Sequence, residues 1–131
     1  MRPAAEAAWI AAGGAAGALA RWGLGLATGA EAQPWPVTTL AVNLAGAAFL
    51  GVLFSLVRAE SAFARRLWAC LGTGALGAFT TYGALGLQLA DMLRQARWAA
   101  ALAYALASLA GGLVACAGGV KLGAALREDR P

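Results

Sequence analysis

The chain is poor in the residues from which most enzyme and metal sites are built. It has no histidine, only two cysteines, and charged side chains at 12% of its 131 positions. An ordinary soluble domain carries about 25% charged residues. Both cysteines, Cys70 and Cys116, lie inside long apolar stretches. Zinc ligation and a Cys/His or Ser/His catalytic pair are therefore excluded, and we do not expect an enzyme.

The residues that are abundant indicate a membrane protein. Hydrophobic residues make up 61% of the chain and 18 positions are glycine, and small residues allow helices to approach closely in lipid. The formal net charge of +4 can indicate a nucleic-acid partner. Here, however, the basic residues flank apolar runs and do not form a cluster. We interpret them as topology signals and expect no nucleic acid.

Four apolar stretches are long enough to cross a bilayer, which needs roughly 20 apolar residues per helix. Three of them contain no charged residue, whereas Arg21 interrupts the first. A secretory signal peptide is the competing interpretation of the first stretch, but three stronger spans follow it and no cleavage is expected. The sequence predicts an all-α transmembrane protein, with one four-helix domain over 1–131 and spans at about 7–28, 37–57, 67–90 and 98–120.

The basic residues are distributed unevenly between the two sides of these spans. Arg94 and Arg97 fall on one side. The other side collects Arg2, Arg58, Arg65, Arg66, Lys121, Arg127 and Arg130. Because Lys and Arg concentrate in cytoplasmic loops, we expect a multi-pass protein of the bacterial inner membrane with both termini in the cytoplasm. A bundle this small cannot easily enclose a solvated path and pack its own core, so an oligomer is expected.

The segment Gly72-Thr-Gly74-Ala-Leu-Gly77 matches the GxGxxG pattern of dinucleotide-binding loops. A nucleotide site would also need a preceding strand and an acidic residue about 20 positions later. The motif instead lies inside a predicted span, and Asp91 is the first acidic residue after it. We therefore interpret these glycines as a place of close helix packing.

The residues that follow this motif are unusual for a lipid-facing helix. Gly77-Ala-Phe79-Thr80-Thr81-Tyr82 places glycine, hydroxyl and aromatic side chains in mid-span. This pattern predicts a break in the third helix. Broken backbone at membrane depth persists only inside protein or beside a polar cavity, where its free carbonyl groups can hold a cation. Ordinary helix packing is the alternative.

Uncharged hydrogen-bonding side chains recur in the other spans. Thr39, Asn43 and Gly46 fall on one face of the second helix, and Tyr104 and Ser108 are one turn apart in the fourth. Neutral donors and aromatic edges without a buried carboxylate are the chemistry of a path for a small anion. The alternative for each of these side chains is an interhelical hydrogen bond.

Arg21 is the one charged residue embedded in a predicted span. It can concentrate anions at a vestibule, or it can extend to the membrane surface and anchor the first helix. The residues alone do not separate these two roles.

Three segments together resemble the Fluc fluoride ion channels, also called CrcB proteins. They are Gly14-Ala-Ala-Gly17-Ala-Leu-Ala-Arg21-Trp22, Thr39-Leu-Ala-Val-Asn43-Leu-Ala-Gly46 and Gly77-Ala-Phe-Thr80-Thr81-Tyr82. The resemblance covers nearly the whole chain. It implies a channel that exports cytoplasmic fluoride passively and so reduces fluoride toxicity.

The resemblance also implies an assembly and a set of site residues. The family forms an antiparallel dimer of four-helix subunits, with two fluoride pores along the interface and a central sodium ion held by backbone carbonyls. In this chain those carbonyls correspond to Gly77 and Thr80. From its charge within the first span, we assign Arg21 to a vestibule. The residues matched to the pore are Thr39, Asn43, Phe79, Thr81, Tyr82, Tyr104 and Ser108.

The chain departs from the family pattern after the double threonine. The family continues Phe-Ser-Thr-Phe, whereas this chain reads Tyr82-Gly83-Ala84-Leu85 and so loses two hydroxyls and one phenylalanine. Its uneven basic residues also favour a single orientation in the membrane. We therefore hypothesise that the chain is one half of an antiparallel heterodimer with an oppositely oriented paralogue that supplies the missing groups. A second copy of the chain is the alternative partner.

Two other functions compete with the fluoride channel. A proton-coupled small-molecule exporter also uses short four-helix subunits, but it needs an ionisable acid at membrane depth, and Glu6 and Asp91 lie near the ends of spans. A non-transporting membrane assembly subunit is the second alternative. That function is favoured if Asn43 and Tyr104 only pack against other helices.

Overall fold

The structure is a computed structural model that describes residues 3–30, 33–57 and 61–128. Its elements in chain order are α1 (Pro3–Thr28), α2 (Val37–Leu56), α3 (Ala62–Leu67), η2 (Trp68–Leu76), α4 (Gly77–Phe79), α5 (Tyr82–Arg94) and α6 (Trp98–Glu128). All are α-helices except η2, which is a π-helix. The described residues contain no strand, so the prediction of an all-α fold is confirmed.

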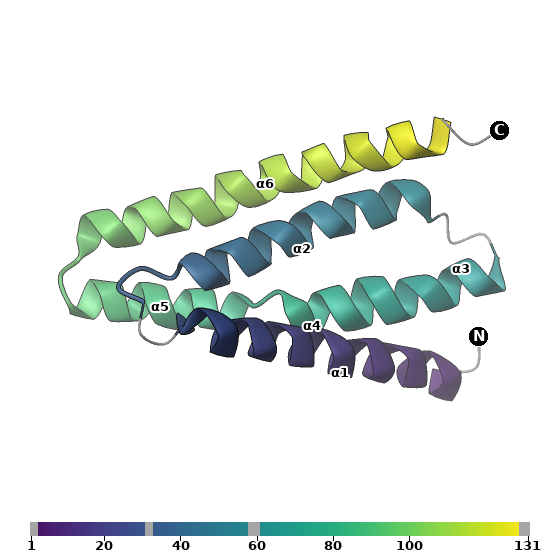
Figure 1. The fold of residues 1–131 in the computed structure, drawn as a ribbon, viewed down its shortest axis with the longest axis horizontal. Helices are drawn as coiled ribbons and strands as arrows, with labels where there is room; N and C mark the ends of the chain where they lie inside the picture. Colours follow the sequence, from purple (N-terminus) through teal and green to yellow (C-terminus); the bar gives the residue numbers. More distant parts are fainter. Residues whose placement is uncertain (1–2, 31–32, 58–60, 129–131) are drawn as a thin grey trace.

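The helices form four long units that lie side by side. The elements α3, η2 and α4 follow one another without a gap, and with α5 they make the third unit. In Figure 1 this unit lies between α1 and α2, and α6 lies beyond α2. Successive units run in opposite directions, so the start of α1 and the end of α6 lie at the same end of the bundle (Figure 1).

Several helices extend beyond the apolar stretches that predict them. The first begins at Pro3, α3 begins at Ala62, and α6 continues to Glu128. At the start of α3 the Ser61 hydroxyl oxygen accepts a hydrogen bond of 3.0 Å from the backbone N–H of Ala64, which is a standard N-cap. The apolar stretch ends at the first charged residue, whereas the helix ends only where its backbone geometry changes.

The third unit is interrupted at Thr80 and Thr81, where the sequence predicts a break. Both residues have extended backbone, with φ/ψ of −76/156° and −145/113°. The backbone N–H of Thr80 and its hydroxyl both donate to the Leu76 carbonyl oxygen, at 3.0 and 2.9 Å. A new helix then begins at Tyr82. The π-helix η2 upstream of the break is not predicted by the sequence pattern.

Close helix contacts occur where α1 crosses the third unit, and small residues make them possible. A Cβ on Gly74 would lie 2.5 Å from the Ile10 carbonyl oxygen. Side-chain carbons on Gly13 and Gly17 would overlap the carbonyl oxygens of Cys70 and Ala75. Gly74 belongs to the GxGxxG segment, so the packing interpretation is confirmed at Gly74, whereas nothing lies within 4 Å of a Cβ on Gly77. In the same way, α2 packs closely on α6.

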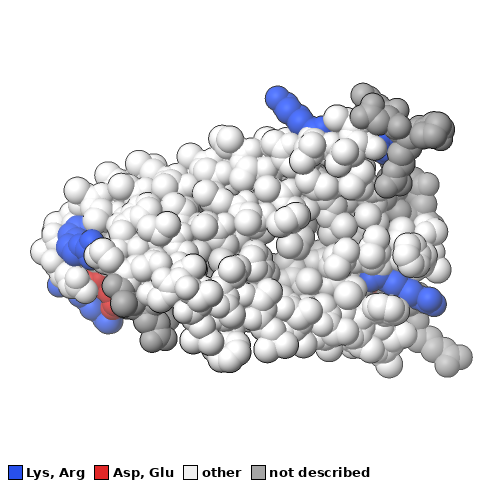
Figure 2. Space-filling model, in the orientation of Figure 1, with Lys and Arg blue, Asp and Glu red and all other residues white. Residues whose placement is uncertain are grey.

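The outer surface of the bundle is apolar. Large side chains such as Leu19, Phe54 and Val114 are 64%, 68% and 72% exposed. Figure 2 shows Lys and Arg at the left end and in the right half, with an uncharged band between them. Two described helices, Val37–Leu56 and Trp98–Arg127, are long and apolar enough to cross a membrane. This surface suits lipid contact, because lipid-facing helices need no polar exterior.

Candidate functional site

A cavity of about 460 Å³ lies between α1, α2 and the beginning of α5. Its wall includes Arg21 from α1, Thr39 from α2 and Thr81 from the break. Three of the sequence-predicted site residues are therefore brought together around one space, although they are far apart in the chain.

Arg21 is held at the level of the helix break. Its side chain is partly buried, and Nε donates a hydrogen bond of 3.0 Å to the carbonyl oxygen of Ala78. This carbonyl belongs to α4, whose last carbonyl groups carry partial negative charge. The side chain of Arg21 therefore contacts the third helix, and Arg21 also lines the cavity.

Asn43 binds the backbone of the break through both ends of its carboxamide. Its Oδ1 accepts a hydrogen bond of 2.8 Å from the Thr81 N–H, and its Nδ2 donates to the Thr81 carbonyl oxygen at 3.2 Å. The close approach of α2 to the break is possible because Gly46 has no side chain, since a Cβ there would overlap Cγ2 of Thr80. The predicted face of Thr39, Asn43 and Gly46 thus turns toward the third helix.

An uncharged chain of hydrogen bonds connects three helices beside this break. Gln88 on α5 donates through Nε2 to the Thr39 hydroxyl oxygen at 2.9 Å, and its Oε1 accepts from the Tyr104 hydroxyl at 2.8 Å. Sequence reasoning missed Gln88. The available signal was the same one that singled out Asn43, because Gln88 is the one carboxamide within 67–90.

The two predicted polar residues of α6 differ in how well they are satisfied. Tyr104 is fully buried, and its ring meets that of Trp35 edge to face with centroids 5.4 Å apart. Ser108, one turn later, has a buried hydroxyl oxygen without a hydrogen-bond partner among the described residues. A buried polar atom of this kind is uncommon in folded proteins. It lies on the same helix face as a residue of the hydrogen-bonded chain.

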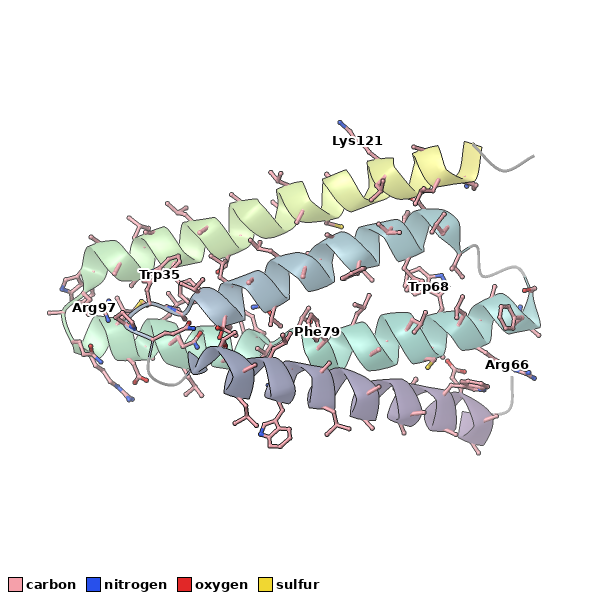
Figure 3. All side chains as sticks on the ribbon, viewed as in Figure 1. Trp35, Arg66, Trp68, Phe79, Arg97 and Lys121 are labelled. Atoms are coloured by element: carbon pink, nitrogen blue, oxygen red, sulfur yellow. The ribbon has the colours of Figure 1, made fainter. Side chains whose placement is uncertain are left out.

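The two aromatic residues around the break occupy different places. Phe79 points from α4 toward α2 (Figure 3) and lines a smaller apolar cavity with Thr38 and Val42. The side chain of Tyr82 is 87% exposed on the outside of the bundle. A single chain therefore does not bring Phe79 and Tyr82 together at one site.

The carbonyl groups of Gly77 and Thr80 fit a small hard cation by their chemistry. Both residues line a cavity of about 280 Å³ that also includes Asn43, and neither carbonyl oxygen accepts a hydrogen bond within the described part of the chain. Oxygen ligands suit hard cations. Side-chain metal sites are a different case, because no group of three or more His, Cys, Asp or Glu residues gathers among the described residues.

The acidic side chains of Asp91 and Glu6 lie outside the interior of the bundle. Among the residues that the structure describes, no charged side chain is fully buried. Asp91 is exposed near the end of α5, where it lies 3.5 Å from Arg94, and Glu6 is exposed in the first turn of α1. The interior therefore offers amide, hydroxyl and guanidinium donors without a competing carboxylate from these positions.

Comparison with known proteins agrees with this chemistry. A family model described as CrcB-like protein, Camphor Resistance (CrcB), matches residues 8–120. A protein of Chloroflexus aurantiacus named "Fluoride-specific ion channel FluC" is 36% identical over 87% of this chain and 91% of its own length. A Gloeobacter violaceus protein of the same name is 40% identical, over 84% and 89%.

A third relative, from Bordetella petrii, also carries the name "Fluoride-specific ion channel FluC". It is 37% identical over 90% of this chain and 91% of its own length. These relatives are named as ion channels and not as enzymes. Since the family model and the relatives cover most of the sequence, the chain belongs to the CrcB family of membrane proteins.

Proposed function

We propose that the chain is a fluoride-selective channel that exports cytoplasmic fluoride passively. The observation that carries this proposal is the uncharged hydrogen-bond chain through Thr39, Gln88 and Tyr104, which lies beside a broken helix. The relatives named as fluoride channels support it. Hydrogen fluoride crosses bilayers in neutral form and ionises in a near-neutral cytoplasm, so a selective leak benefits the cell.

Fluoride is small and strongly hydrated, so a path for it must replace its water with other donors. Amide, hydroxyl and aromatic-edge groups do this in a narrow path, and larger halides should fit less well. Outward movement of one anion down an inside-negative potential is favourable by about 2.3 kcal/mol per 100 mV. No proton-carrying group and no energy source is needed.

The helix break supplies both signs of partial charge at membrane depth. The N-terminus of α5 presents backbone N–H groups and attracts an anion, whereas the C-terminal carbonyls of α4 attract a cation. Thr81 stands at this N-terminus and lines the same cavity as Arg21. Arg21 then raises the local anion concentration at the entrance, as a vestibule residue does.

The proposed cation is sodium, bound by the Gly77 and Thr80 carbonyls. Two carbonyl oxygens are too few for a stable site, because hard cations take six or more oxygen ligands or retain water. A second subunit in antiparallel orientation would bring two more carbonyls to the same place. The exposed Tyr82 supports such an assembly, since a tyrosine beside the break is 87% exposed and has no hydrogen-bond partner among the described residues.

The partner in this dimer is a second copy of the chain or an oppositely oriented paralogue. The lopsided distribution of Lys and Arg favours a single orientation, with both termini in the cytoplasm of a bacterial inner membrane. In Figure 3, Arg97 lies at one end of the bundle, Arg66 lies at the other, and Lys121 lies on α6 in the half that contains Arg66. A paralogue would also supply the phenylalanine and hydroxyls that are replaced at Gly83, Ala84 and Leu85.

The test is anion efflux from liposomes loaded with fluoride or chloride and containing the purified chain. Fast fluoride loss without chloride loss supports a channel that works as a homodimer. Efflux only after an oppositely oriented paralogue is added supports the heterodimer. Absence of fluoride efflux in both preparations would overturn the channel proposal and leave a membrane assembly subunit.

A further inference from the structure

The break frees two particular carbonyl oxygens, and helix geometry identifies the amide groups that would otherwise occupy them. In an α-helix each backbone N–H bonds the carbonyl four residues earlier. A continuous third helix would therefore pair the N–H of Thr81 with the Gly77 carbonyl. It would likewise pair the N–H of Ala84 with the Thr80 carbonyl.

Both amide groups are instead bonded to side-chain oxygens. The Thr81 N–H donates to Oδ1 of Asn43 at 2.8 Å. The Ala84 N–H donates to Oγ1 of Thr81 at 3.1 Å. Each side chain thus takes the hydrogen bond that the helix would have given to one of the two carbonyls.

We propose that Asn43 and Thr81 are positioning residues that create the cation site by intercepting these two amide protons. Because Oδ1 and Oγ1 satisfy the amides, the Gly77 and Thr80 carbonyls remain unpaired and available to a small hard cation. The inference rests on the proposed function and deepens it. It gives Asn43 a task at the cation site in addition to any contact with the permeating anion.

The second half of the Asn43 carboxamide strengthens the arrangement. Its Nδ2 donates to the Thr81 carbonyl oxygen at 3.2 Å, so that carbonyl is removed from competition for the cation. One of the two N–H bonds of this group remains for another acceptor. A residue that only bound the anion would have no reason to satisfy the N–H and the C=O of the same backbone unit.

An alternative backbone state makes the proposal testable. Without the side-chain acceptors, the cheapest way to satisfy the Thr81 and Ala84 amides is to close the break toward continuous helix, since unpaired buried amides are costly. Closure would pair the Gly77 and Thr80 carbonyls and remove them as ligands. Loss of either acceptor should therefore weaken sodium binding selectively.

The experiment measures the melting temperature of the purified full-length protein in detergent as sodium replaces N-methyl-D-glucamine at constant ionic strength. Sodium that binds only the folded state should raise the melting temperature in proportion to its occupancy. The variants are Asn43→Leu and Thr81→Val, which keep shape and remove the acceptors. Thr39→Val is the matched control, because it deletes a hydroxyl from the same cavity without touching the break.

We expect the sodium concentration for half of the effect to rise by roughly 10- to 100-fold in Asn43→Leu and Thr81→Val, the range seen when residues that support metal ligands are lost. Thr39→Val should keep the wild-type concentration. If Asn43→Leu does not fold, Asn43→Ser removes the two-ended contact with a smaller change. If these side chains only stabilise the fold, the substitutions should lower the melting temperature without changing the sodium concentration that gives half of the effect.

The proposal is overturned if both acceptor variants need the same sodium concentration as the wild type for half of the rise in melting temperature. It is also overturned if the melting temperature of the wild-type protein does not change with sodium. Fluoride efflux measured on the same preparations separates this inference from the proposed function. A protein that responds to sodium, loses the response in the acceptor variants and passes no fluoride would support the cation site while refuting the channel.

Discussion

The hydroxyl of Tyr104 and the carboxamide oxygen of Gln88 are joined by a 2.8 Å hydrogen bond that links α6 to α5. This bond fixes the orientation of the Gln88 amide, because its oxygen is occupied by Tyr104 and its nitrogen must then face Thr39. The donor groups along the chain therefore have a defined direction. The Tyr104 O–H and one N–H of Gln88 are used in these two bonds, so the second N–H of Gln88 Nε2 remains as a donor.

Tyr104→Phe should disturb the orientation of the Gln88 amide with little change in the shape of the side chain. It leaves the Gln88 oxygen without its donor, which costs about 1–3 kcal/mol for a buried group. If a comparable penalty falls on the permeating anion, fluoride efflux should fall about tenfold for every 1.4 kcal/mol. Efflux from liposomes, normalised to the amount of inserted protein, is the measurement. Unchanged efflux would place the hydrogen-bond chain outside the path.

Asn43→Asp should abolish fluoride efflux more completely than a neutral substitution. A carboxylate there repels the permeating anion and also faces the Thr81 carbonyl oxygen, to which the present amide donates. A proton-coupled exporter or an assembly subunit should tolerate the change far better. The comparison with Asn43→Ser in the same liposome assay separates the effect of charge from the loss of the amide.

Ser108→Ala should separate conduction from stability. The Ser108 hydroxyl oxygen is buried and has no partner among the described residues, so its removal should leave the free energy of unfolding unchanged or raise it. If this hydroxyl lies on the anion path, fluoride efflux should nevertheless fall. If Ser108→Ala equals the wild type in both stability and fluoride efflux, the hydroxyl contributes to neither property.

Gly17→Ala should weaken the packing of α1 on the third unit. The added methyl group overlaps the Ala75 carbonyl oxygen, and overpacking of this kind costs about 1–3 kcal/mol. Gly23→Ala is the matched control in the same helix, because nothing lies within 4 Å of its Cβ. That control should be neutral or stabilising by up to about 1 kcal/mol, since alanine favours helix more than glycine. The free energy of unfolding of both variants can be measured by titration with a denaturing detergent.

The sequence predicts the broad architecture well because that architecture depends on local patterns. Long uncharged stretches mark α2 and α6, and the hydroxyl-rich Gly77–Tyr82 segment marks the break. The ends of helices are predicted less well. Lipid exposure decides where an apolar stretch ends, whereas capping at Ser61 decides where α3 begins.

The sequence identifies many of the residues at the site, but it does not predict the hydrogen bonds that they form. The polar face of α2 follows from helical spacing, but the partners of Asn43 depend on backbone groups of a helix that begins more than 30 residues later. Gln88 was missed because its neighbours are ordinary apolar residues. The element η2 packs against α1, and no local propensity indicates its π-helical geometry.

The pairwise packing of the bundle affects how substitutions at the site will behave. Most interhelical contact lies within two pairs, α1 with the third unit and α2 with α6, and the pairs meet mainly around the break and beside Tyr104. The residues proposed to bind ions therefore also form the contact between the two helix pairs. Loss of transport in this protein and loss of its assembled form will therefore tend to arise from the same substitutions.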